Sequence, residues 1–242
     1  MLNETPLSYS DGNLNFEGLV VRDPSLSGTL PGVLVFHEAW GLGNHAIERA
    51  RMLARLGYVA FAADMFGERR QVKNLKEMIQ QVGPMVEDRE LTRSRAQAAV
   101  LAFKNCPQVD QAKICAIGFC FGGLVCLELA RCGCDIRGVV SFHGRLHRSD
   151  SAATGKISTK ILVCTGAEDP HVPDEQIAEF IAEMREADAD WELQIYGRAK
   201  HSFTNPDAPQ DNEIPGLEYD PEADRRSWNS MRDFLQEAFA IA

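Results

Sequence analysis

The fold of this chain is decided by the stretch KICAIGFCFGGL, residues 113–124. Its first half is an apolar run typical of a buried strand, and an apolar helical pattern follows it. Between the two stands Gly-x-Cys-x-Gly-Gly, in which Gly118 and Gly122 flank Cys120. A strand that turns sharply into a helix needs glycine there, because a Cβ would clash with the neighbouring strand or helix. The pattern predicts a nucleophile elbow that exposes Cys120 above a sheet.

Cys120 would then lie at the N-terminus of the helix that follows. The positive end of a helix favours anions, so a thiol there is biased toward the thiolate, its nucleophilic form. The alternative is a buried cysteine at a glycine-rich turn, one of seven cysteines in the chain. The pentapeptide alone does not decide between the two interpretations.

Two later strands end at residues that suit such a nucleophile. Residues 160–170, KILVCTGAEDP, predict a strand and a turn that holds Asp169, and residues 191–203 predict a strand followed by His201. Both side chains then lie at the carboxyl edge of the sheet, where open α/β sheets place their chemistry. We expect Cys120 to attack, His201 to transfer the proton and Asp169 to orient the imidazole. The alternative is an ordinary turn aspartate and a lone surface histidine.

Strand and helix patterns alternate along the chain, which predicts an α/β fold with a mainly parallel sheet covered by helices on both faces. We expect one domain over residues 1–242, in which residues 66–83 form at most a small cap. Residues 204–219 are expected to form a long connection, and the alternative is an active-site flap. Strands are expected at 14–21, as an antiparallel edge, and at 32–36, 58–63, 114–117, 137–142, 161–165 and 191–196. Helices are expected at 45–56, 72–82, 91–104, 124–131, 174–187 and 221–240, with a break at Gly83-Pro84.

Five pieces of sequence, spread over most of the chain, resemble the dienelactone hydrolase family of α/β-hydrolases. They are FHEAWG at 36–41, GYVA at 57–60, GFCFGG at 118–123, GAED at 166–169 and HSF at 201–203. The resemblance implies an α/β-hydrolase fold without a large cap domain. It also implies a cofactor-free, carboxymethylenebutenolidase-like enzyme that hydrolyses carboxylic esters or lactones through an acyl-cysteine intermediate.

The same resemblance assigns roles to residues near Cys120. The glutamate at the position of Glu38 contacts the cysteine in the resting enzyme and swings when substrate binds. The backbone N–H groups of Ala39 and Phe121 would form the oxyanion hole, which agrees with the general rule for this fold. The alternative for Glu38 is a solvated loop carboxylate.

The sequence departs from this family at Asn205. Dienelactone hydrolases carry an arginine four residues beyond the catalytic histidine, and that arginine binds the substrate carboxylate. An amide cannot replace a bidentate guanidinium, so an anionic dienelactone does not follow as the preferred substrate. Other arginines that could serve, each otherwise a surface charge, are Arg69, Arg70, Arg93, Arg95 and Arg198.

Composition limits the possible partners. A net charge of −10 argues against nucleic-acid and anionic-membrane surfaces. The longest apolar stretches have the length of strands, and the N-terminus lacks the pattern of a signal peptide. An odd number of cysteines in apolar segments indicates reduced thiols in a cytoplasm. We expect no metal site, because Cys132-Gly133-Cys134 has no second ligand pair and His37-Glu38 lacks the second histidine of a metalloprotease helix.

The sequence therefore predicts a small-molecule ester or lactone as substrate and a monomer or small homo-oligomer. Two alternatives remain. One is acyl transfer from a thioester or a small amide. The other is a non-catalytic relative in which Cys120 acts as a redox-sensing thiol.

Overall fold

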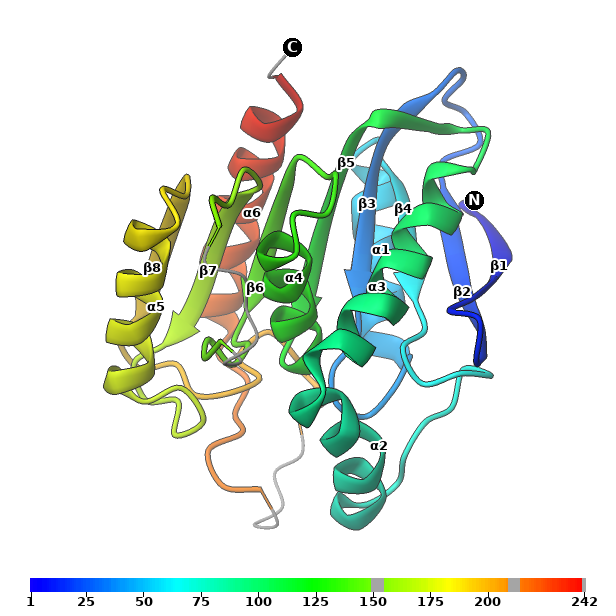
Figure 1. The fold of residues 1–242 in the computed structure, drawn as a ribbon. Helices are drawn as coiled ribbons and strands as arrows, with labels where there is room; N and C mark the ends of the chain where they lie inside the picture. Colours follow the sequence, from blue (N-terminus) through cyan, green and yellow to red (C-terminus); the bar gives the residue numbers. More distant parts are fainter. Residues whose placement is uncertain (149–154, 209–213, 241–242) are drawn as a thin grey trace.

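The computed structural model describes residues 1–148, 155–208 and 214–240, in which strands and helices alternate (Figure 1). Within these residues one eight-stranded sheet has the order β1-β2-β4-β3-β5-β6-β7-β8. The six strands from β4 to β8 in that order are parallel, whereas β2 is antiparallel to both β1 and β4. The strands are β1 (Asn3–Ser10), β2 (Asn15–Arg22), β3 (Leu30–Phe36), β4 (Val59–Ala63), β5 (Val109–Phe119), β6 (Gly138–Phe142), β7 (Lys160–Gly166) and β8 (Trp191–Tyr196).

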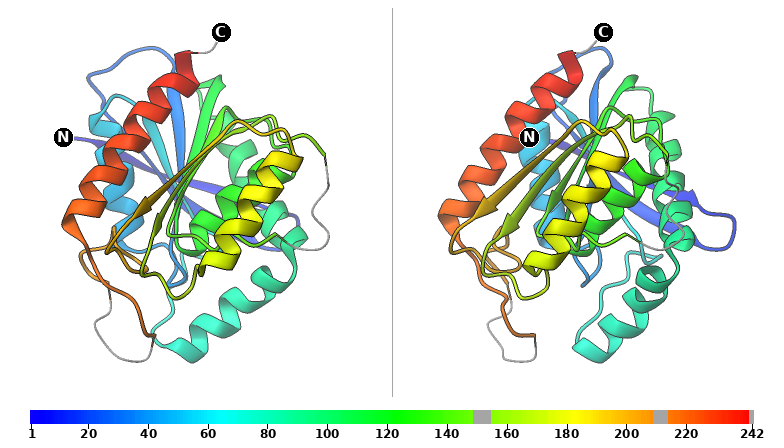
Figure 2. Two further views of the ribbon diagram at one scale, coloured as in Figure 1. Left: turned by 90° about the vertical axis from the view of Figure 1, so that its left-hand side faces the viewer. Right: turned by 60° about the vertical axis from the view of Figure 1, so that its left-hand side comes forward.

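Helices cover both faces of the sheet, as the views in Figure 2 show. Helices α1 and α6 pack on one face, where they share an apolar core with alternate residues of the strands. Helices α3, α4 and α5 pack on the other face around a second apolar core, and α2 packs against α3. The predicted fold class is therefore confirmed. The helices are α1 (Asn44–Arg55), α2 (Leu75–Glu87), α3 (Arg89–Lys104), α4 (Phe121–Arg131), α5 (Asp174–Glu186) and α6 (Pro221–Ala240).

Two expectations about the fold are wrong. Strand β1 was not expected, and it makes β2 an inner strand rather than the edge. Most side chains of β1 are exposed, so its sequence lacks the apolar alternation that marks a half-buried strand. Helix α2 also continues through Gly83-Pro84 and ends at Glu87, since an interior proline removes only one donor of the helix ladder. The break comes at Asp88, whose carboxylate accepts hydrogen bonds from the first amides of α3.

The turn between β5 and α4 has the tight geometry that its glycines predict. Cys120 has a φ of 53° and a ψ of −112°, a strained conformation for a residue with a side chain. A Cβ on Gly118 would lie 2.0 Å from the carbonyl oxygen of Gly122, and one on Gly122 would lie 2.2 Å from that of Phe36. Only glycine allows the strand, the turn and the helix to approach so closely.

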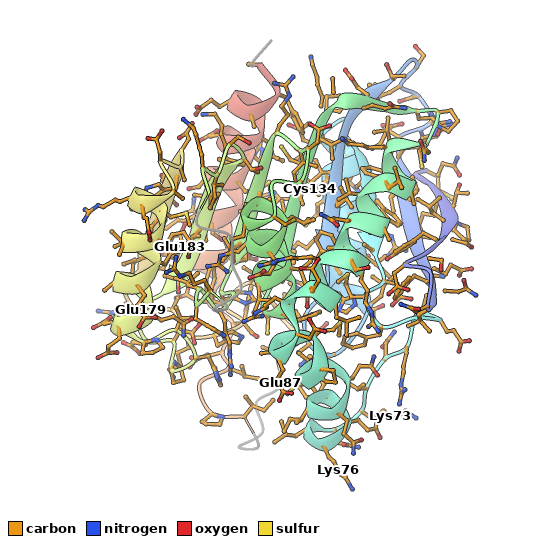
Figure 3. All side chains as sticks on the ribbon, in the orientation of Figure 1. Lys73, Lys76, Glu87, Cys134, Glu179 and Glu183 are labelled. Atoms are coloured by element: carbon orange, nitrogen blue, oxygen red, sulfur yellow. The ribbon has the colours of Figure 1, made fainter. Side chains whose placement is uncertain are left out.

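The parallel strands all end at one edge of the sheet, and this edge carries the candidate site. Helix α2 lies on the same side, with Lys76 and Glu87 near its two ends, whereas Cys134 lies toward the opposite edge (Figure 3). All seven cysteines are free thiols. No helix among the described residues is long and apolar enough to cross a membrane.

Candidate active site

Cys120 lies at the turn after β5, half-buried, and directly precedes the first residue of α4. Its backbone N–H donates to the carbonyl of Phe142 at 3.0 Å and also lies 3.1 Å from Nδ1 of His143. The amide of the cysteine is therefore held by the end of β6 and by the residue that follows it. The thiol itself faces a cavity that it shares with the other candidate residues.

His201 and Asp169 come together from the ends of β8 and β7. Nδ1 of His201 lies 2.8 Å from Oδ2 of Asp169, and the imidazole is 5% exposed. The other carboxylate oxygen of Asp169 accepts the backbone N–H of His171 at 2.8 Å. Asp169 is thus held at both oxygens, which fixes the orientation of the imidazole.

The pKa of His201 is raised to about 10. Burial by itself lowers the pKa of this group, but the adjacent Cys120 and the hydrogen-bonded Asp169 both favour the imidazolium and outweigh burial. The arrangement can hold a protonated imidazole beside a sulfur atom, which is the geometry of a thiolate–imidazolium pair.

Glu38 follows β3 and is buried, so it is not the solvated loop carboxylate of the alternative interpretation. Its Oε2 accepts a hydrogen bond from Nδ2 of Asn205 at 2.7 Å and faces Nδ1 of His45 at 3.5 Å. Burial raises the pKa of Glu38, but His45, His201 and Asn205 together outweigh it and lower that pKa. Among the described residues the hydrogen bond to Glu38 comes from Asn205, and none joins Glu38 to Cys120.

The two residues whose amides are expected to form an oxyanion hole lie at the carboxyl edge of the sheet. Ala39 follows Glu38 in the loop after β3, and Phe121 begins α4. Neither backbone N–H donates a hydrogen bond to another described residue. Both residues line the cavity next to Cys120, so their N–H groups are available to an oxygen atom of a ligand.

The cavity has a volume of about 250 Å³ and mostly apolar walls. Helix α2 supplies five of the lining residues, and four of them, Met78, Ile79, Val82 and Gly83, fall within the segment 66–83. Part of the predicted connection at 204–219 lies outside the described residues. The lining residues are Glu38, Ala39, Trp40, Met78, Ile79, Val82, Gly83, Val86, Cys120, Phe121, Leu124, Arg145, His171, His201, Ser202, Ile214 and Leu217.

None of the five arginines named from the sequence lines this cavity. Arg69 pairs with Glu17 at 3.4 Å, and Arg93 pairs with the buried Glu128 at 2.8 Å. The arginine that does line the cavity is Arg145, which is exposed and follows β6.

Sequence reasoning also missed three histidines around the site. His171 lies with its ring centroid 4.8 Å from that of His201, His143 lies 5.2 Å from the same ring, and His45 faces Glu38. Each follows a strand or lies in the first turn of a helix at the carboxyl edge of the sheet. This position in the sequence is the signal that could have identified them. No group of three or more His, Cys, Asp or Glu side chains in the described part of the chain could hold a metal ion.

A mainly parallel sheet with a cysteine elbow and an Asp–His pair at its carboxyl edge defines an α/β-hydrolase. The chain belongs to the dienelactone hydrolase family, whose sequence pattern matches residues 16–239. It is therefore a hydrolase, as predicted, and the fold lacks a large cap among the described residues.

Individual proteins are similar to this chain over different lengths. The crystal structure of a dienelactone hydrolase-like promiscuous phosphotriesterase from metagenomic libraries is 44% identical, with a TM-score of 0.93, and the match covers 98% of this chain and 99% of that one. An uncharacterised Caenorhabditis elegans protein is 40% identical over 154 residues, which are 61% of this chain and 94% of that protein. A dienelactone hydrolase from Anabaena variabilis shares the fold at 20% identity and a TM-score of 0.70, covering 97% of this chain and 98% of that one.

Proposed function

We propose that this protein hydrolyses carboxylic esters or lactones with Cys120 as the nucleophile. The observation that carries the proposal is the pair of His201 and Asp169, joined at 2.8 Å beside the cavity that Cys120 lines. A buried imidazole whose pKa is raised to about 10 keeps its proton at neutral pH. That proton is available to a leaving group, and its charge stabilises a thiolate.

The reaction has two halves. In the first, the thiolate of Cys120 adds to the carbonyl carbon and the oxyanion accepts hydrogen bonds from the N–H groups of Ala39 and Phe121. The C–O bond breaks as His201 gives its proton to the leaving oxygen, which leaves an acyl-cysteine. In the second, neutral His201 takes a proton from water, the hydroxyl adds to the acyl carbon, and the C–S bond breaks to release the acid.

In this proposal Asp169 and Glu38 both support these steps. Asp169 keeps the ring proton on Nδ1 and stabilises its positive charge. Glu38 is a buried carboxylate on the same cavity, and its lowered pKa keeps it ionised. In this proposal Glu38 favours the imidazolium form of His201.

The substrate that suits the cavity is small and largely apolar. A volume of about 250 Å³ accepts a short acyl chain or a single ring. The amide of Asn205 is committed to Glu38, so it offers no cation for a substrate carboxylate. We therefore expect neutral esters and lactones to react with higher kcat/KM than carboxylated dienelactones.

A second candidate activity is hydrolysis of phosphotriesters. The observation that favours it is the similarity, at 44% identity and a TM-score of 0.93, to the promiscuous phosphotriesterase. A thiolate can attack phosphorus as it attacks a carbonyl carbon, and the same two amides can accept a phosphoryl oxygen. Thioesters and small amides would use the same groups.

Turnover of p-nitrophenyl butyrate and p-nitrophenyl diethyl phosphate tests both activities. Cys120→Ala should abolish both, whereas Cys132→Ala, at a half-buried thiol directly after α4, should leave them unchanged. Mass spectrometry after limited iodoacetamide treatment should find Cys120 modified in proportion to the loss of activity. A Cys120→Ala protein that retains its activity contradicts the proposal. An inactive protein whose Cys120 is readily oxidised supports the redox-sensing alternative instead.

A further inference from the structure

His45 and Arg49, one turn apart on α1, lie behind Glu38 and have no place in the reaction as described so far. Both are largely buried, with side chains 10% and 6% exposed. A histidine and an arginine removed from water need partners, since an unpaired buried polar group is costly. Their partners form a chain that ends at the cavity.

The chain begins on α6. Nη2 of Arg49 lies 2.7 Å from Oδ1 of Asp224 and also donates to the carbonyl of Thr204. The guanidinium lies over the rings of Phe119 and Trp228, at 5.6 and 5.0 Å from their centroids. Arg49 is therefore fixed by charge, by a backbone oxygen and by two aromatic faces.

Arg49 and Thr204 together fix the position of the His45 ring. Nε2 of His45 lies 3.2 Å from Nε of Arg49, which is a donor, and 3.1 Å from the carbonyl oxygen of Thr204, which is an acceptor. The ring is therefore held at Nε2 from two sides. Nδ1 faces Oε2 of Glu38 at 3.5 Å, within the range of an ion pair, and makes no hydrogen bond to a described residue.

Two side chains approach the same oxygen of Glu38. Asn205 donates a hydrogen bond to Oε2 from the loop after His201, and His45 faces the same Oε2 from α1. The other oxygen, Oε1, is buried without a partner among the described residues. A carboxylate contacted only at Oε2 keeps its direction as long as both side chains stay in place.

We propose that His45, oriented by Arg49, is a positioning residue that holds the ionised Glu38 toward Asn205 and away from Cys120. Without it, the carboxylate is free to turn toward the sulfur, where its negative charge would disfavour the thiolate. This inference rests on the proposed role of Glu38, and it adds a group on α1 to a site otherwise built at strand ends.

The test is a double-mutant cycle on the full chain with His45→Phe and Glu38→Gln. Phenylalanine keeps most of the ring volume and removes both nitrogens. We expect His45→Phe alone to lower kcat/KM for p-nitrophenyl butyrate about ten-fold and to slow alkylation of Cys120. In the Glu38→Gln background the same change should alter kcat/KM less than about two-fold, because residues that act through one another are not additive.

Conservative variants separate positioning from structure. His45→Asn keeps an N–H donor near the place of Nδ1 and should restore most of the lost activity. His45→Gln lacks that donor and should remain impaired, and it replaces His45→Phe in the cycle if the phenylalanine variant does not fold.

Equal losses in both backgrounds, or no recovery with asparagine, overturn the inference while the role of Glu38 stands. If Glu38→Gln has wild-type kinetics, the role of Glu38 and this inference both fail. Full activity of Cys120→Ala is the separate result that rejects the proposed reaction.

Discussion

Replacement of Asp169 by asparagine tests the proton path most directly. The carboxylate lies 2.8 Å from Nδ1 of His201, and both groups are buried. A hydrogen bond to a charged group contributes about 1.5–3 kcal/mol, which corresponds to about 10- to 100-fold in rate when it is made to the imidazolium of the transition state. Asparagine can also turn its NH₂ toward Nδ1 and favour the wrong tautomer. We expect kcat/KM to fall by about a thousand-fold in total.

The same change should also alter how the stability of the folded protein depends on pH. The pKa of His201 is raised from 6.5 to about 10 in the folded protein. A raised pKa means that the protonated imidazole contributes to stability fully below about pH 6.5 and that this contribution is lost as the pH rises through 10. Asp169→Asn removes one cause of the raised pKa. The stability that the variant loses relative to the wild type should therefore be largest at low pH and should shrink as the pH rises toward about 10.

The assay combines kcat/KM for p-nitrophenyl butyrate with urea unfolding at pH 6, 8 and 10. Asp174→Asn is the matched control, because it removes an exposed carboxylate at the start of α5 and should change kcat/KM by less than about two-fold. A kcat/KM for Asp169→Asn within ten-fold of the wild type would refute the assigned role of Asp169. A stability loss that does not change with pH would refute the assigned charge of His201.

Three further changes test specificity and stability. Asn205→Arg should raise kcat/KM for an anionic ester relative to that for a neutral ester about ten-fold. If assays with the two esters show an unchanged ratio, residue 205 does not decide whether a substrate carboxylate is recognised. Glu128→Gln should lower the free energy of unfolding, measured in urea, by about 3 kcal/mol. The fully buried carboxylate contacts Arg93 at 2.8 Å and Arg131 at 3.0 Å, and its loss leaves both cations underpaired. A change below about 0.5 kcal/mol would show that these ion pairs contribute nothing net to stability. Gly118→Ala should yield little folded protein by circular dichroism, because the added Cβ meets backbone at 2.0 Å, and a fully stable variant would show that the elbow can relax.

The sequence by itself determined the fold class and the places of the main candidate residues. Residues 113–124 carry both the period of a buried strand and the glycines of the turn, so the elbow could be predicted locally. Asp169 and His201 were found because parallel strands bring their carboxyl ends to one edge. Strand β1 could not be found in this way, since its mostly exposed side chains form no apolar pattern.

Only the tertiary structure decided what surrounds these groups. Glu38 could be named from its motif, but its partners come from α1 and from the loop after His201, at sequence distances that no local pattern records. The same holds for Arg145 and for the apolar wall supplied by α2. Strand and turn patterns report the backbone, which local sequence controls. The direction of a buried charged side chain depends instead on which distant donors reach it, and only the packed chain fixes them.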